Sequence, residues 1–147
     1  MAKIVQLGSY DRNIGDNIAL YNIRHNMETN RPSDKQPLDW LNLDINTFHI
    51  LNNSIQHSKN IFKDLQNNHG VDMLVIGGGG LFENAKRYDS GWKLPFTEEV
   101  LQEIKIPVVV YAAGINYFYN FPQLDERAKE EVINLCKASD LFSLRND

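Results

Sequence analysis

The chain has 147 residues, a formal net charge of −4, 42% hydrophobic residues and 23% charged residues, which is the profile of one globular domain with a sizeable core. The negative charge and the lack of a Lys/Arg-rich run argue against nucleic acid or an anionic membrane surface as a partner. No stretch approaches the ~18 apolar residues of a spanning helix, and the first residues hold too short an apolar run for a signal peptide. Cys136 is the single cysteine, so a disulfide framework is excluded and we expect a cytoplasmic protein.

Apolar runs and helical stripes alternate along the chain, separated by polar turn segments. The patterns predict strands at 3–7, within 38–51, at 71–76, at 108–112 and at 141–144, and helices at about 17–27, 54–67 and 123–138, with a short one after Thr97. Because strands and helices alternate, we expect an α/β, Rossmann-like fold: a mostly parallel sheet with helices on both faces.

Helical periodicity also predicts which side chains of each helix face the sheet. Asp16 is expected to cap the first helix. The expected inward residues are Ala19, Leu20, Ile23 and Met27 in the first helix, Ile55, Ile61, Phe62 and Leu65 in the second, and Leu124, Ala128, Val132, Leu135 and Cys136 in the last.

Four consecutive glycines, Gly77–Gly80, follow the apolar strand at 71–76 and are the most distinctive local feature. Ligands of open α/β sheets bind outside the carboxyl ends of the strands, where glycines let backbone N–H groups approach a ligand closely. The run is not a dinucleotide fingerprint, which needs spaced glycines, and no Gly-Lys-Ser/Thr makes it a P-loop. We therefore expect a ligand site; the alternative is a plain surface loop.

Further candidates follow other expected strand ends, in the loops 8–16, 77–93 and 114–122 and at 145–147. Asn13, Gly15 and Asp16 stand at a helix start, where Asp16 is a candidate hydrogen-bond acceptor or base; the alternative is a helix cap worth ~1 kcal/mol. Arg145 is a candidate two-pronged clamp for a phosphate or carboxylate, or else a surface arginine paired with a nearby aspartate.

Aromatic and histidine side chains offer weaker signals. A sugar-stacking platform and packing against a neighbouring domain are equally good interpretations of one aromatic set: Tyr88, Trp92, Tyr117, Phe118, Tyr119 and Phe121. The four histidines lack metal-ligand spacing, so we expect solvated side chains and no metal site: His25, His49, His57 and His69.

Four motifs in series resemble the polysaccharide pyruvyl transferase family over nearly the whole chain. They are Asn13-x-Gly15-Asp16-Asn17-x-Ala19-Leu20, Asp72-Met73-Leu74-Val75-Ile76-Gly77-Gly78-Gly79-Gly80-Leu81, Val109-x-Tyr111-x-Ala113-Gly114-Ile115 and Phe142-Ser143-Leu144-Arg145-Asn146-Asp147. The resemblance implies transfer of a pyruvyl group from phosphoenolpyruvate to a sugar hydroxyl as a ketal, during surface polysaccharide synthesis. It also implies a GT-B-like, twin Rossmann-like architecture with the active site between the two halves.

The resemblance further implies that residues 1–147 are the amino-terminal half and that a carboxy-terminal domain supplies much of the donor pocket. We then expect little turnover from 1–147 alone, no cofactor beyond phosphoenolpyruvate as donor substrate, and a sugar or glycan-lipid acceptor. The expected cleft lining is Asn13, Gly15, Asp16, Gly77, Gly78, Gly79, Gly80, Gly114 and Arg145, with Asp16 as the catalytic candidate. The alternative is a non-catalytic sugar- or nucleotide-binding Rossmann-like module, or an inactive remnant.

Overall fold

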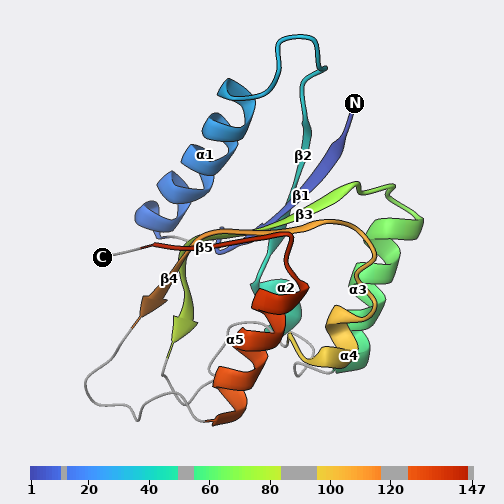
Figure 1. Cartoon of the computed structure of the whole chain (residues 1–147), viewed down its shortest axis with the longest axis vertical. Helices are drawn as coiled ribbons and strands as arrows, with labels where there is room; N and C mark the ends of the chain where they lie inside the picture. Colours follow the sequence, from blue (N-terminus) through green and yellow to red (C-terminus); the bar gives the residue numbers. More distant parts are fainter. Residues whose placement is uncertain (11–12, 50–54, 84–95, 117–125, 146–147) are drawn as a thin grey trace.

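The structure is a computed structural model that describes residues 1–10, 13–49, 55–83, 96–116 and 126–145. Five parallel strands form one sheet in the order β2-β1-β3-β4-β5 (Figure 1). The strands are β1 (Lys3–Gly8), β2 (Asp39–Asp44), β3 (Met73–Glu83), β4 (Val108–Asn116) and β5 (Leu141–Leu144). The expected α/β, Rossmann-like fold with a parallel sheet is confirmed.

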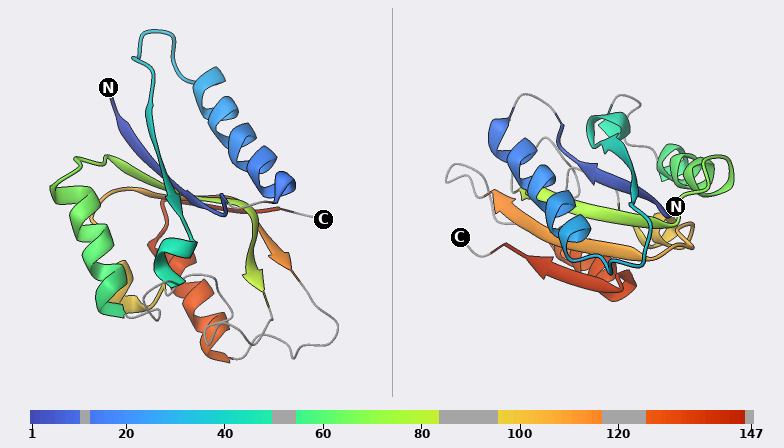
Figure 2. Two further views of the ribbon diagram at one scale, coloured as in Figure 1. Left: turned by 180° about the vertical axis from the view of Figure 1, so that it is seen from behind. Right: turned by 90° about the horizontal axis from the view of Figure 1, so that it is seen from above.

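Helices cover both faces of this sheet unequally. The helices are α1 (Ile14–Thr29), α2 (Asn46–His49), α3 (Ile55–Asn67), α4 (Glu98–Leu101) and α5 (Glu126–Ala138). α1 lies alone on one face, and the other four helices lie on the opposite face (Figures 1 and 2). No helix in the described part of the chain is long and apolar enough to cross a membrane.

The larger hydrophobic cluster lies between the sheet and helices α2 to α5. Phe62 packs between Phe48 and Phe96, with ring centroids 5.6 and 6.3 Å apart, against strand residues such as Leu74 and Val110. A smaller cluster under α1 joins Ile4, Ile23 and Val75. The central strands β1 and β3 are therefore buried on both faces, which explains why both are rich in apolar residues.

Four expected element boundaries were wrong, one of them the end of the strand expected at 108–112, since β4 continues to Asn116 beside the extended β3. α1 begins at Ile14 with Asn13 as its N-cap, so Asp16 lies in the first turn and does not cap the helix. β3 does not end at residue 76; it runs through all four glycines to Glu83, because they still pair with β4. Part of the loop expected within 38–51 forms the short helix α2.

Two expected inward residues were also wrong. Ile55 is 36% exposed because it lies in the first turn of α3, before the buried positions Ser58 and Phe62. Cys136 is exposed because it follows buried Leu135 by ~100° around α5. The side chains of Leu124 and Ala128 lie outside the described residues.

Candidate functional site

The glycine run gives the middle of β3 a backbone that other residues rarely adopt. The φ angles of Gly77, Gly78 and Gly79 are 153°, 81° and 95°, in the region that favours glycine. A β-carbon at Gly77 would also lie 1.9 Å from the carbonyl oxygen of Tyr111 on β4. Beyond this run the last parts of β3 and β4 turn together toward the side of the sheet that carries α5 (Figures 1 and 2).

α1 packs directly on this side-chain-free backbone. A β-carbon at Gly78 would lie 3.0 Å from the backbone nitrogen of Leu20, and one at Gly8 would lie 2.5 Å from Leu20 Cδ2. These glycines therefore allow α1 to approach the strands closely, whether or not they also contact a ligand. The expectation of a glycine-lined loop is replaced by a glycine strand under a helix.

Asp16 lies over the third glycine of the run. Its side chain is mostly buried, with 9% of the residue exposed, and a β-carbon at Gly79 would lie 2.1 Å from its Oδ1 atom. The first turn of α1 places this carboxylate at the positive end of the helix dipole. Asn13 and Gly15 form the cap, because Asn13 Oδ1 accepts a hydrogen bond from the Gly15 N–H at 3.0 Å.

Arg145 lies beside Gly114, a glycine of β4 whose β-carbon position is next to the Gly79 carbonyl oxygen. A β-carbon at Gly114 would lie 3.4 Å from Arg145 Nη2 and 3.2 Å from the Gly79 carbonyl oxygen. The Arg145 backbone N–H donates to the Ala113 carbonyl at 3.1 Å, which ties the end of β5 to β4. The structure thus assembles Asp16, Gly79, Gly114 and Arg145 in sequence across the sheet.

The other glycines of the predicted run lie beside Gly79 on β3. Gly77 pairs with Tyr111 and Gly80 with Gly114 in the β3–β4 ladder. Gly78 lies under Leu20. These glycines therefore position Gly79 against Asp16 and next to Gly114, which lies beside Arg145.

Ala112 is a feature that sequence reasoning missed. Its φ is 53°, and in the described part of the chain it is the one residue other than glycine with a positive φ. The β4–β5 register shifts between Val110 and Ala113, so Ala112 lies in a bulge. A left-handed alanine costs roughly 1–2 kcal/mol, and bulges often re-aim side chains next to functional sites.

Other sequence candidates lie elsewhere or outside the description. The aromatic set of residues 88, 92, 117–119 and 121 falls outside the described residues. His25 stacks on Tyr21, while His69 Nε2 lies 3.2 Å from Asp64 Oδ2. Within the described ranges, no group of three His, Cys, Asp or Glu side chains could hold a metal ion.

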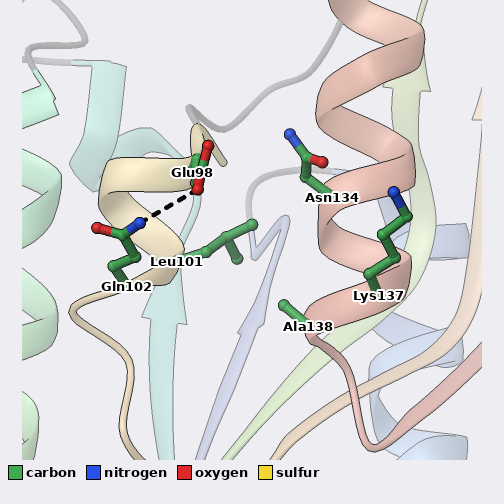
Figure 3. Close-up of a pocket in the computed structure, with 6 residues that line it drawn as sticks. All are labelled: Glu98, Leu101, Gln102, Asn134, Lys137 and Ala138. Carbon is green, nitrogen blue, oxygen red and sulfur yellow. Dashed lines mark hydrogen bonds between the residues drawn. The ribbon is translucent and has the colours of Figure 1, made fainter.

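A hollow of about 380 Å³ lies between α4 and α5, away from the glycine strand (Figure 3). Its lining residues are Glu98, Leu101, Gln102, Asn134, Lys137 and Ala138. Because α5 ends at Ala138 and β5 starts at Leu141, the hollow lies near the amino end of the sheet. It is separate from the candidate site, which lies toward the carboxyl ends.

Fold and site together define an α/β protein of the doubly wound class, whose ligands bind near the carboxyl ends of the strands where the strand order reverses. A family model described as "Polysaccharide pyruvyl transferase" matches residues 13–147, so the chain belongs to that family, which is a family of transferases. Comparisons with curated proteins and with solved structures found no significant match. The family predicted from the sequence is confirmed.

Proposed function

We propose that this chain serves in the transfer of a pyruvyl group from phosphoenolpyruvate to a sugar, forming a ketal in surface polysaccharide biosynthesis. Membership of the pyruvyl transferase family supports the proposal. The observation that carries it is that Asp16 lies against Gly79 and Arg145 lies against the neighbouring Gly114. A carboxylate and a guanidinium beside a strip without side chains suit a reaction between a hydroxyl group and an anionic donor.

The reaction needs two hydroxyl groups of one acceptor. A general acid protonates the methylene carbon of phosphoenolpyruvate, and the first hydroxyl oxygen bonds to the central carbon and loses its proton. The second hydroxyl oxygen then displaces the phosphate group, and its proton leaves with the inorganic phosphate. The products are a ketal with two new C–O bonds and inorganic phosphate, so the added proton is returned and no redox cofactor is needed.

In this scheme Asp16 accepts the proton of an attacking hydroxyl, and Arg145 binds the phosphate or carboxylate of the donor. Gly79 and Gly114 leave room beside the backbone for the Asp16 carboxylate and the Arg145 guanidinium, and Gly80 pairs with Gly114. Asn13 and Gly15 support the site by fixing the start of α1. The donor is a substrate and not a resident cofactor, and the cytoplasm is the proposed compartment.

A second domain completes the site in this proposal, as in a GT-B-like architecture. α1 carries exposed apolar side chains that begin two residues before Asp16: Ile14 is 74% exposed, Ile18 54% and Tyr21 67%. Such a stripe is typical of a surface that contacts another domain. We therefore expect that residues 1–147 alone turn over little substrate.

A non-catalytic sugar- or nucleotide-binding module, or an inactive remnant, is the second candidate. It is favoured by the packing of Leu20 on Gly78, since this contact explains part of the glycine run without any reaction. Both candidates share the fold and differ in whether Asp16 takes part in chemistry.

The deciding experiment uses the complete open reading frame that contains residues 1–147. Phosphate release from phosphoenolpyruvate is measured with a panel of methyl glycosides, and ketal formation is followed by NMR. The proposal expects acceptor-dependent release that falls at least a hundredfold in Asp16→Asn, within the usual range for general base catalysis, roughly 10²–10⁴. Asp34→Asn is the control, because Asp34 is an exposed residue paired with Lys35 at 3.5 Å. Full activity in Asp16→Asn, or no ketal from any glycoside, contradicts the catalytic proposal.

A further inference from the structure

The guanidinium of Arg24 on α1 is held by uncharged side chains of β1, β2 and Tyr10. Its Nε donates to Gln6 Oε1, and its Nη2 donates to Asn42 Oδ1 and, at 3.1 Å, to Tyr10 Oη. The guanidinium also lies 5.2 Å from the centroid of the Trp40 ring. Four contacts therefore fix a positive charge without a carboxylate among them.

Glu28 is the residue that would ordinarily neutralise Arg24, since it lies four positions later on the same helix. In the structure, the carboxylate of Glu28 binds other groups. Its Oε1 accepts from Trp40 Nε1 at 3.1 Å and from the Leu38 N–H at 3.0 Å, and its Oε2 contacts Arg31 Nε at 3.2 Å. Glu28 therefore leaves the charge of Arg24 unbalanced.

The carboxylate of Asp44, the last residue of β2, interacts electrostatically with Tyr10 of this cluster. It raises the pKa of Tyr10 as a minor cause, after burial. Its Oδ1 accepts a hydrogen bond from the Asn46 N–H at 2.7 Å at the start of α2. Within the described residues, no ion pair joins Asp44 to Arg24.

The cluster presents hydrogen-bond donors and no spare acceptor where Arg24 meets Asn42. A guanidinium has five N–H donors, and the contacts above leave those on Nη1 without a partner in the described part of the chain. Asn42 must turn its oxygen toward Arg24, which can only donate, so its Nδ2 remains a donor on an exposed side chain. A positive charge with unpaired donors matches a group that is anionic and only accepts hydrogen bonds.

The buried side of the cluster keeps these donors in place. Gln6 is fully buried in β1 and its Nε2 donates to the Leu20 carbonyl at 3.0 Å. Tyr10 Oη donates to the Gln6 carbonyl at 3.0 Å, and burial raises the pKa of Tyr10, so the hydroxyl stays protonated at neutral pH. Because the side chain of Arg24 is already ordered, binding an anion costs little further conformational entropy.

We propose that Arg24 and Asn42 form an anion-binding subsite that takes a phosphate ester or a carboxylate. The subsite is distinct from the pair of Asp16 and Arg145. Arg24 lies eight residues after Asp16 on α1, which is about 12 Å at ~1.5 Å per residue. The subsite faces β2, whereas the candidate site lies over β3 and β4, and the inference holds whether or not the chain is a transferase.

The test is a titration of the ¹⁵N-labelled chain with inorganic phosphate and, separately, with acetate, with sodium chloride added to keep the ionic strength constant. We expect saturable shifts of the Arg24 Nε–H and the Asn42 side-chain amide signals. The anion that binds more tightly identifies the ligand class as phosphate or carboxylate. Absence of saturation with both anions overturns the proposal.

Three variants separate a specific subsite from general attraction by positive charge. Asn42→Asp keeps the shape of the cluster and supplies an internal carboxylate to Arg24, so it is expected to weaken anion binding at least tenfold. Arg24→Gln is expected to do the same, and Arg31→Gln, whose charge is already paired with Glu28, is expected to bind as the parent does.

Equal affinity in Asn42→Asp and the parent overturns the subsite, and so does a loss in Arg31→Gln as large as that in Asn42→Asp. If Arg24→Gln does not fold, the anion affinity of Asn42→Asp compared with the parent still tests the subsite. This variant retains the contacts of Arg24 with Gln6, Tyr10 and Trp40.

Discussion

Asp16 covers Gly79 so closely that a β-carbon on this glycine would lie 2.1 Å from the aspartate's Oδ1 atom. The contact joins the first turn of α1 to the middle of β3, two elements that are separated in the sequence by β2, α2 and α3. It explains how a glycine that is neither in a turn nor in a loop positions the candidate catalytic group.

Gly79→Ala is expected to displace Asp16 and destabilise the fold. Its φ of 95° adds backbone strain to the clash, so we expect a loss of about 2–4 kcal/mol, more than the ~1–2 kcal/mol of strain alone. Gly70→Ala is the matched control, because Gly70 has a φ of 61° with no atom near its β-carbon position. Urea unfolding measures both; equal losses would show that the contact with Asp16 carries no energy.

Asn13→Ala is expected to cost about 1 kcal/mol of unfolding free energy, because Asn13 caps α1 through its bond to the Gly15 N–H. Asn13→Ser should restore most of the loss, since serine is also a good cap. Circular dichroism during urea unfolding measures both variants. If Asp16→Asn costs more helix stability than Asn13→Ala, Asn13 is not the principal cap.

Gly15→Ala distinguishes a structural from a ligand-binding role for that glycine. Gly15 lies inside α1 with ordinary φ, and a β-carbon would meet only Asn13 Oδ1 at 3.3 Å. Alanine in a helix should stabilise by roughly 0.5–1 kcal/mol, less a few tenths for this contact. If stability holds while turnover of the complete protein falls, Gly15 contacts substrate; if both are unchanged, its place in the site is refuted.

Stability at alkaline pH should depend on Tyr10. Burial is the main cause that raises its pKa above the usual 10.0, against the lowering effect of Arg24. Between the unfolded and folded pKa values the folded state holds more protons, so stability falls as pH rises. The contribution is complete below about pH 10 and disappears as pH rises through the folded pKa.

Tyr10→Phe tests this dependence directly. We expect a lower baseline, by about 1 kcal/mol for the lost hydrogen bonds, and a flatter decline in urea-measured stability above about pH 10. Tyr21→Phe is the control, since Tyr21 is 67% exposed. Parallel declines in the parent and Tyr10→Phe would contradict a raised Tyr10 pKa.

The sequence by itself determined the fold class, the five strands and the family. This was possible because strands β1 and β3 are buried on both faces, so both are rich in apolar residues, with Gln6 as the buried polar residue of β1. Thr97 was recognised as the cap of α4, and its side chain accepts from the Val100 N–H, because capping depends on residues within one turn.

Only the tertiary structure decided what the glycines do and which charges meet. The conformation of Gly77 to Gly79 depends on Tyr111 and Leu20, which local periodicity cannot identify as neighbours. The pairing of Arg24 with Gln6 and Asn42 likewise joins α1 to two strands. Local propensity determines which elements form, whereas the packing of distant elements determines which polar groups are brought together without a partner of opposite charge.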